Sequence, residues 1–178
     1  MDNNMFKNVI LETDRLILRN FTQEDKNEFY IITRDPKIYE TLPEDHIYSL
    51  EEISEIIDWF IYQYNNNIPE NIPKYSLAIV LKDEQKIIGD IGIGQYSNDR
   101  TKTEIFYFIN SKYWNKGYVS EATNVFLNHV KINKLVHTLI GTVVPKNIAS
   151  KKILIKNGFK EIKHEYNDER DMYELKIK

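Results

Sequence analysis

The chain has 178 residues, of which 42% are hydrophobic and 29% charged, and its formal net charge is -3. One domain spanning residues 1–178 is expected from this length, and the slightly acidic balance argues against nonspecific binding to nucleic acid or to an anionic membrane. The absence of cysteine excludes a disulfide framework and a thiolate nucleophile. Because the sequence shows no signal peptide and no run of about 18 apolar residues, we expect a cytoplasmic protein.

The first half of the chain predicts a strand, two helices and a three-stranded meander. Capping-box patterns at Thr22 and Ser49 begin the helices, and the second is followed by apolar residues at helical spacing. Asp35-Pro36 is expected to end the first helix. The expected elements are strand 15–20, helices 22–34 and 49–64, loop 65–73, and strands 75–81, 87–96 and 103–109.

The second half predicts one strand–helix–strand crossover and a closing hairpin. A helix with Val119, Ala122, Phe126 and Val130 on one face follows a polar loop, and Gly158 is suited to end the last helix. The expected elements after the first of these helices are strand 135–144, helix 147–157, and strands 159–166 and 172–177 joined over 167–168. The pattern is that of a mixed α/β (α+β) fold with mainly antiparallel strands.

Residues 107–122 form the most informative segment. An aromatic and β-branched strand runs into a short polar loop around Gly117, which opens directly into a helix. Such a junction aims unpaired backbone N–H groups and the positive end of the helix dipole at one spot, which suits a phosphate or pyrophosphate. Residues 145–159 supply polar groups and lysines at another helix start. Together the two segments predict a protein that holds a nucleotide-tailed cofactor and does chemistry at its far end.

Three segments carry motifs of one family. They are L-E-T-D-R-L-I-L-R at 11–19, E-I-F-Y-F-I at 104–109 followed by Y-W-N-K-G-Y-V-S-E-A at 113–122, and N-I-A-S-K-K-I-L-I-K-N-G-F at 147–159. In this order they resemble the GNAT superfamily of acyl-CoA-dependent N-acyltransferases, in particular its branch of ribosomal-protein N-terminal (Rim-type) acetyltransferases. The resemblance implies a mostly antiparallel twisted sheet of about six to seven strands with about four helices, and acetyl-CoA as co-substrate without a metal.

Three positions depart from the family's pattern. Asn115 replaces the first loop glycine, and because Asn tolerates positive φ better than most residues, the loop is expected to keep its shape. Lys112 stands where the family often has Gln or Arg. Phe106 replaces the glycine that follows Glu104-Ile105, and it narrows the space beside the reacting group.

The cofactor is expected to lie along the open strand and the two helix starts. Backbone N–H groups of the loop would bind the pyrophosphate, the alternative being a plain strand–helix turn, and the strand before it would pair with the pantetheine amides. The resemblance implies that Asn147 contacts the pantetheine arm, while its alternative role is to cap the helix. For each lysine the alternative is a solvated helix face. The predicted cofactor-binding residues are Phe108, Ile109, Asn110, Trp114, Asn115, Lys116, Gly117, Tyr118, Val119, Asn147, Lys151 and Lys152.

Glu104 and Ser150 are the predicted catalytic residues. Glu104 is placed to accept a proton from the amine, or else forms an ordinary cross-strand pair. The resemblance implies that Ser150 lies near the cofactor sulfur as a proton donor or relay, and the alternative is an ordinary first-turn serine. An α-amine is about a fifth neutral near pH 7.4, whereas a lysine amine is neutral about once in a thousand, so an N-terminal acceptor would need little help from a base.

The acceptor is expected to be a primary amine, either a protein N-terminus or a small molecule. With no cysteine and no Ser-His-Asp arrangement, direct attack in a ternary complex is favoured over an acyl-enzyme. Glu40, Glu44, Asp45 and His46 would attract a cationic amine or form a solvated loop. The remaining histidines, His129, His137 and His164, show no metal-ligand spacing.

Two other readings stay open at this stage. The chain could be a non-catalytic acyl-CoA-binding or sensing module, or an interaction module that uses exposed aromatic residues. Nucleic-acid binding ranks last because of the net charge. No membrane partner is expected, and the protein is predicted to be a monomer or a homodimer.

Overall fold

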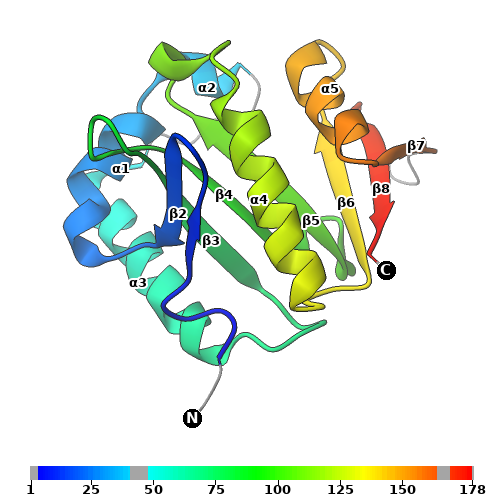
Figure 1. Cartoon of the computed structure of the whole chain (residues 1–178), viewed down its shortest axis with the longest axis horizontal. Coiled ribbons are helices and arrows are strands. Elements are labelled where there is room, and N and C mark those ends of the chain that lie inside the picture. The colour runs from blue at the N-terminus through cyan, green and yellow to red at the C-terminus, as the bar shows by residue number, and fades with distance from the viewer. Residues whose placement is uncertain (1–3, 41–47, 164–168, 178) are drawn as a thin grey trace.

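The computed structural model describes residues 4–40, 48–163 and 169–177. The strands are β1 (Ile10–Glu12), β2 (Leu16–Asn20), β3 (Lys74–Leu81), β4 (Lys86–Tyr96), β5 (Asp99–Ile109), β6 (Thr138–Val143), β7 (Lys160–Ile162) and β8 (Asp171–Lys176). The helices are α1 (Lys26–Thr33), α2 (Pro36–Tyr39), α3 (Leu50–Asn66), α4 (Tyr118–Ile132) and α5 (Ile148–Lys156), with 3-10 turns η1 (Gln23–Asp25) and η2 (Ser111–Tyr113). The strands form one sheet in the order β1-β2-β3-β4-β5-β6-β8-β7 (Figure 1).

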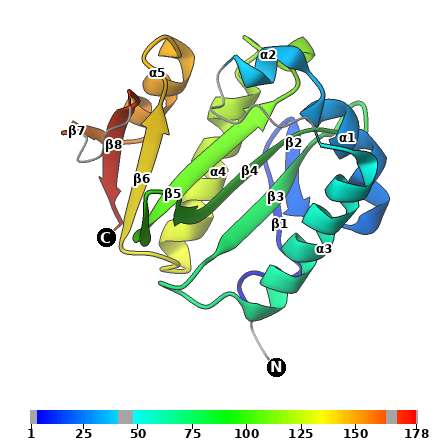
Figure 2. The same cartoon turned by 180° about the vertical axis from the view of Figure 1, so that it is seen from behind.

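Helices cover both faces of the sheet. On one face α1 contacts β4 and α3 contacts β3, while on the other α4 crosses β2, β4 and β5 and α5 lies over β6 (Figures 1 and 2). The predicted apolar faces of α3 and α4 point into these two layers. Their fully buried members are Ile53, Ile57, Phe60, Tyr64, Ala122, Phe126 and Val130. The apolar periodicity therefore predicted both helices and the side that each buries.

The helix ends follow the predicted local chemistry. Ser49 Oγ accepts from the Glu52 N–H at 3.2 Å and Glu52 Oε2 accepts from the Ser49 N–H at 2.7 Å, which completes the capping box of α3. After α5, Gly158 adopts a φ of 89°, the left-handed conformation that ends helices. These signals are encoded within a few residues, so the sequence alone was sufficient to locate them.

The sheet has eight strands and the described residues form five α-helices, both slightly more than predicted. Strand β1 has three residues, too few for a periodic pattern to reveal. Asp35-Pro36, predicted only to end α1, also begins α2: the Asp35 carboxylate accepts from the Lys37 N–H at 3.1 Å, and Pro36 occupies the first helical position. The predicted turn at 167–168 lies outside the described residues.

One pair of neighbouring strands, β5 and β6, is parallel, and the two strands pair at a single position. Glu104 and Ile140 form the single register pair between them, although β5 continues to Ile109 and β6 to Val143. Every other neighbouring pair is antiparallel. The carboxyl-terminal parts of β5 and β6 therefore leave a gap in the middle of the sheet, where open backbone edges are rare without a function.

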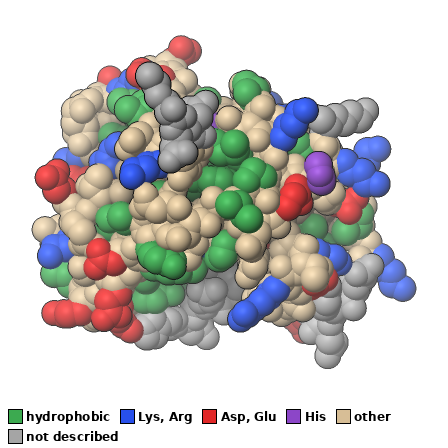
Figure 3. All heavy atoms as spheres, turned by 90° about the horizontal axis from the view of Figure 1, so that it is seen from below, with side chains coloured by type: hydrophobic (Ala, Val, Ile, Leu, Met, Phe, Trp, Pro, Cys, Tyr) green, Lys and Arg blue, Asp and Glu red, His purple; other side chains and the backbone are tan. Residues whose placement is uncertain are grey.

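The surface shows mixed charge. On the face drawn in Figure 3, the described Lys and Arg side chains are interspersed with Asp and Glu, and hydrophobic side chains gather near its centre. None of the helices in the described ranges has the length and apolar character needed to cross a bilayer.

Candidate active site

The edge of β5 that faces the gap is formed by Tyr107 and Ile109. The Asn110 N–H donates to the Ile88 carbonyl at 2.8 Å, which places Asn110 on the edge paired with β4. Because an antiparallel ladder alternates, Phe108 shares that paired edge and the residues between them face away from β4. Trp114 Nε1 donates to the Ile109 carbonyl at 2.9 Å from this open side. The backbone groups of Phe108 and Asn110 therefore face β4, and those of Tyr107 and Ile109 face the gap, while which of these residues pair with a cofactor stays a prediction.

A cleft of about 330 Å³ lies over the gap between the start of α4 and α5. It brings together most of the residues predicted to bind the cofactor. Those that line it are Phe108, Ile109, Trp114, Asn115, Gly117, Tyr118, Val119 and Asn147. The remaining predicted residues, Asn110, Lys116, Lys151 and Lys152, are not among the side chains that line it.

The loop at the mouth of this cleft is shaped by two residues with positive φ. Asn115 has a φ of 61° and Gly117 a φ of 82°, so Asn115 keeps the left-handed backbone that a glycine would supply. The first bond of the α4 ladder runs from the Glu121 N–H to the Gly117 carbonyl at 3.1 Å. The amides of Tyr118, Val119 and Ser120 precede that bond and so have no partner within the helix, and these three residues line the cleft. Such a helix start suits an anion, and the binding of a pyrophosphate here stays a prediction.

Arg15 braces the same loop from the first motif. Its Nη1 donates to the Lys116 carbonyl at 3.0 Å, and its Nε and Nη2 donate to Glu121 Oε2 at 2.8 and 2.6 Å. Thr13 Oγ1 donates to the other oxygen of Glu121 at 2.5 Å, and the guanidinium lies 4.5 Å from the Tyr118 ring centroid. The sequence contains both motifs, at 11–19 and 113–122, but it does not show that Arg15 contacts Lys116 and Glu121. The presence of both motifs in one chain was the only sign of this contact.

The start of α5 supplies the other wall. Asn147 Oδ1 accepts from the Ser150 N–H at 3.0 Å, so Asn147 performs its capping role while also lining the cleft. Lys151 pairs with Asp171 of β8, and this hydrogen bond raises the pKa of the Lys151 ammonium. Lys151 is engaged with Asp171, and its pairing with cofactor phosphates stays a prediction. Lys152 and Lys116 are exposed, and their phosphate role stays a prediction.

Tyr107 and Ser150 meet across the gap. Their hydroxyl oxygens are 2.9 Å apart, and Tyr107 Oη is also 3.3 Å from the Ser150 carbonyl oxygen. Burial raises the pKa of Tyr107 to about 12, so the phenol stays protonated near neutral pH. Tyr107 was not among the predicted site residues. The hydroxyl of Tyr107 within an otherwise apolar strand segment could have suggested a role. Its partner, Ser150, lies 43 residues further along the chain, so no local pattern connects the two.

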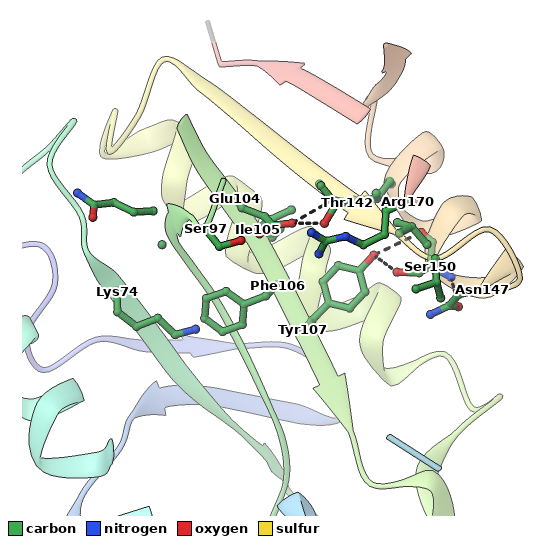
Figure 4. Close-up of a pocket in the computed structure, with 16 residues that line it drawn as sticks. Lys74, Ser97, Glu104, Ile105, Phe106, Tyr107, Thr142, Asn147, Ser150 and Arg170 are labelled. Atoms are coloured by element: carbon green, nitrogen blue, oxygen red, sulfur yellow. Dashed lines mark hydrogen bonds between the residues drawn. The ribbon is translucent and has the colours of Figure 1, made fainter. Parts of the chain in front are cut away.

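A second cavity of about 450 Å³ opens where β5 and β6 separate (Figure 4). It shares Tyr107, Asn147 and Ser150 with the first cleft, so the two cavities meet at these side chains. Lys74 and Phe106 form part of its wall, and Lys74 Nζ lies 3.3 Å from the Phe106 ring centroid. Phe106 thus lines this cavity, and its narrowing of the space beside the reacting thioester stays a prediction.

Glu104 faces this second cavity. Its carboxylate accepts from the Thr142 hydroxyl and, at 3.2 Å, from the Thr142 N–H (Figure 4). Burial raises the pKa of Glu104, and the Thr142 bonds offset only part of that rise. Glu104 and Ser150, predicted as the catalytic residues, therefore line the same cavity.

The histidines and the acidic residues at 40–46 that the sequence suggested do not line these cavities or lie outside the described residues. His129 bonds to Tyr75 Oη at 3.1 Å, and His137 lies 3.8 Å from Glu70. The residues 4–40, 48–163 and 169–177 contain no group of His, Cys, Asp and Glu arranged to hold a metal. Glu40 is exposed, whereas Glu44, Asp45, His46 and His164 lie outside the described residues.

Residues 15–160 match the family model described as acetyltransferase (GNAT) domain. The chain belongs to the GNAT acetyltransferase family. The match covers most of the sequence and confirms the predicted resemblance, so the protein is a GNAT-type N-acetyltransferase. Among its relatives, the uncharacterized N-acetyltransferase YnaD of Bacillus subtilis is 30% identical over 150 residues, which are 84% of this chain and 82% of YnaD.

Solved GNAT structures share the fold. Ribosomal-protein-S5-alanine acetyltransferase from Vibrio fischeri superposes with a TM-score of 0.79 at 18% identity, covering 95% of this chain and 97% of that one. RimL, a ribosomal L7/L12 α-N-protein acetyltransferase solved in complex with coenzyme A, gives a TM-score of 0.78 at 15% identity, covering 95% and 98%. The predicted α+β GNAT fold is therefore confirmed.

Proposed function

We propose that this GNAT protein transfers an acetyl group from acetyl-CoA to a primary amine, with the cofactor in the cleft between α4 and α5 and the amine in the cavity at Glu104. The observation that carries the proposal is that these two cavities meet at Tyr107, Asn147 and Ser150. A cofactor entering from one side and an amine from the other would meet there. Among similar structures, RimL was solved with coenzyme A and the self-immunity acetyltransferase MccE with acetyl-CoA and AMP.

The residues of the first cleft fit such a cofactor. The left-handed backbone at Asn115 and Gly117 presents the first amides of α4, which suit a pyrophosphate. The open edge at Tyr107 and Ile109 offers backbone groups to an extended amide-bearing arm. When bound, acetyl-CoA supplies an acetyl group activated as a thioester.

Glu104 is the proposed base. Its raised pKa makes the carboxylate a better proton acceptor than an ordinary exposed Glu, while the two Thr142 donors hold it in place. The proton of the attacking amine would pass to this carboxylate directly or through one water molecule. An uncharged amine is then available in the cavity.

Ser150 and Tyr107 form the proposed proton relay. A serine hydroxyl alone is a poor acid, but Ser150 Oγ is hydrogen-bonded to a phenol that stays protonated near neutral pH. The relay can therefore give a proton to the leaving sulfur and recover one from solvent. A protonated amine loses two protons in all: one passes to Glu104 and on to solvent as the free amine forms, and the second leaves nitrogen as the C–N bond forms. The sulfur gains one proton as the C–S bond breaks, and because the acetyl group passes directly to nitrogen, no covalent acyl-enzyme is needed.

The acceptor is proposed to be a protein N-terminus or a small primary amine. The branch of the family that the motifs resemble favours an N-terminus, and RimL is named for that activity. An α-amine has a pKa near 8, so an appreciable fraction is uncharged at neutral pH even before Glu104 acts.

The first test is thermal unfolding with acetyl-CoA and, separately, with adenosine. A ligand at about 100 times its dissociation constant stabilises the native state by roughly 2.7 kcal/mol, which raises the unfolding midpoint by several degrees. We expect a larger rise with acetyl-CoA than with adenosine. A thiol reagent then follows CoA release with candidate amines, and the chain contributes no background because it holds no cysteine.

Two outcomes separate the rival functions. A shift with acetyl-CoA but no release of CoA with any amine would favour a non-catalytic binding module. No shift at any concentration would overturn the proposed cofactor site.

A further inference from the structure

A third cavity, of about 220 Å³, lies between α1, α2, α3 and the strands β3 to β5. It shares Ile38 and Phe108 with the cofactor cleft, and it shares Lys74 with the cavity at Glu104. The third cavity therefore adjoins both parts of the proposed active site. None of the proposed catalytic steps uses it.

Half of the residues that line the third cavity are aromatic. Phe29 stacks on Phe108 with ring centroids 6.1 Å apart and lies 6.4 Å from Phe60, which in turn lies 6.1 Å from Trp59. Phe29 and Phe60 are buried, whereas Trp59 is 44% exposed. A ring placed here would extend an aromatic cluster in which edge-to-face and offset contacts are favourable.

The volume sets the size of the occupant. An apolar cavity of about 150 Å³ is large enough to bind benzene, and the third cavity is larger. It has room for one aromatic ring or one branched aliphatic group. A polyamine in this cavity would make few favourable apolar contacts with the aromatic side chains of the wall.

The carboxylate of Asp90 in the cavity wall is also compatible with an uncharged occupant. Asp90 is 2% exposed, and both of its carboxylate oxygens accept from Ser76 Oγ, at 2.7 and 2.9 Å. Burial raises the pKa of Asp90 to about 6, and the nearby Lys74 ammonium acts against that rise. The one carboxylate among the residues lining this cavity therefore has a hydrogen-bond donor in Ser76 and a nearby cation in Lys74, so a charged group of the acceptor is not required to pair with it.

We infer that the third cavity receives an aromatic or branched apolar group of the acceptor, so that the enzyme selects primary amines that carry such a group near the amine. The inference rests on the proposed function, since the occupant is a part of the acceptor. It adds the substrate class: an aromatic or branched primary amine, free or at the N-terminus of a peptide, in preference to a polyamine.

Trp59 provides a test that is independent of turnover. The chain has two tryptophans, so in a Trp114→Phe background the fluorescence reports Trp59 alone. We expect phenethylamine to change this fluorescence in a saturable manner and putrescine to leave it unchanged. A protein that shows no saturable response to phenethylamine would overturn the inference.

Variants on α3 show whether the response comes from the cavity. Ile56 lines it, whereas Ile61 lies on the same helix, is also half-buried and does not line it. Ile56→Phe should weaken phenethylamine binding at least about tenfold, as expected for lost space in an apolar pocket, and Ile61→Phe should not. If Ile56→Phe fails to fold, Ile56→Ala should instead tighten a two-ring amine such as naphthylethylamine. Equal binding by the Ile56 and Ile61 variants would contradict the inference.

Turnover separates this inference from the proposed function. With the wild-type protein we expect kcat/KM for phenethylamine to exceed that for putrescine at least about tenfold. If amines are acetylated without any such preference, the inference fails and the proposed function stands. If Trp59 responds as expected but no amine is acetylated, the cavity binds amines and the proposed function fails.

Discussion

At Glu104, burial and the two Thr142 donors act in opposite directions on the carboxyl pKa, and burial prevails. A base must be deprotonated to act, so activity should rise with pH through this raised pKa and level off above it. The acid limb of the kcat/KM profile is therefore expected above about 4.3, the pKa of an ordinary Glu. An acid limb at or below that value would contradict the environment described for Glu104.

Replacing the base should cost more for a more basic acceptor. Glu104→Gln keeps the acceptor oxygen for Thr142 but cannot take a proton, so kcat/KM for an alkyl primary amine should fall about 100-fold or more. The loss should be smaller for an α-amine, of which about a fifth is neutral near pH 7.4. Steady-state rates with both acceptors check this, and an equal loss for the two would show that Glu104 has another role.

The Tyr107 and Ser150 hydroxyls, 2.9 Å apart, should act as one unit. Tyr107→Phe and Ser150→Ala should each lower kcat about tenfold or more, and the double variant should lose little beyond the worse single one. Unfolding midpoints of all three variants control for loss of the fold. Fully additive losses would show that the two hydroxyls act in separate steps.

Among elements, the loop between β5 and α4 is held at both ends by residues distant in sequence. The Ser111 N–H donates to Asp35 at 2.6 Å near its start, and the Lys116 carbonyl accepts from Arg15 at 3.0 Å near its end. The amides at the start of α4 are thereby aimed before any cofactor arrives. Such preorganisation lowers the entropy cost of binding.

Arg15→Ala should release one end of this loop. We expect the KM for acetyl-CoA to rise roughly tenfold, a loss of about 1.4 kcal/mol, with kcat nearly unchanged because Arg15 touches no reacting group. Lys7→Ala is the matched control, since exposed Lys7 donates from Nζ to Asn65 Oδ1 at 3.0 Å and does not contact the loop. If both variants raise the KM equally, the brace has no specific role.

The sequence predicted those elements whose signals are local. The caps at Ser49 and Gly158, the buried faces of α3 and α4 and the positive φ at Asn115 all depend on residues within a few positions of one another. The gap between β5 and β6 depends instead on how strands distant in the sequence pair, which no short pattern records.

Side-chain partners across the chain were missed for the same reason. The contact of Arg15 with Glu121, 106 residues away, and the capture of Lys151 by Asp171 are set by the assembled sheet. The site was therefore predictable as a set of segments, but not as a set of contacts.

For the whole molecule, the buried Asp90 links stability to pH. Burial raises its pKa to about 6 in the folded state, against about 3.9 in an unfolded chain. The folded state thus binds more protons at Asp90 between these values, so the contribution of Asp90 to stability is fully present below about pH 4 and is lost as the pH rises through about 6. The shift corresponds to roughly 3 kcal/mol at neutral pH.

Asp90→Asn should remove this dependence. The amide cannot ionise and still accepts from Ser76, so the unfolding midpoint at neutral pH should rise by several degrees, and the fall between about pH 4 and 6 should flatten. Denaturant unfolding at a series of pH values measures both effects, with Asp83→Asn, an exposed carboxylate, as control. A lower stability at neutral pH in Asp90→Asn would contradict the assignment.

Mass spectrometry of the acceptor tests the central claim most directly. The protein is incubated with acetyl-CoA and a panel of primary amines, including peptides with a free N-terminus. The masses of the acceptors are then measured. We expect an amine to gain one acetyl group for each CoA released, and Glu104→Gln to slow this gain. Release of CoA without an acetylated amine, or no transfer to any amine by a protein that binds acetyl-CoA, would contradict it.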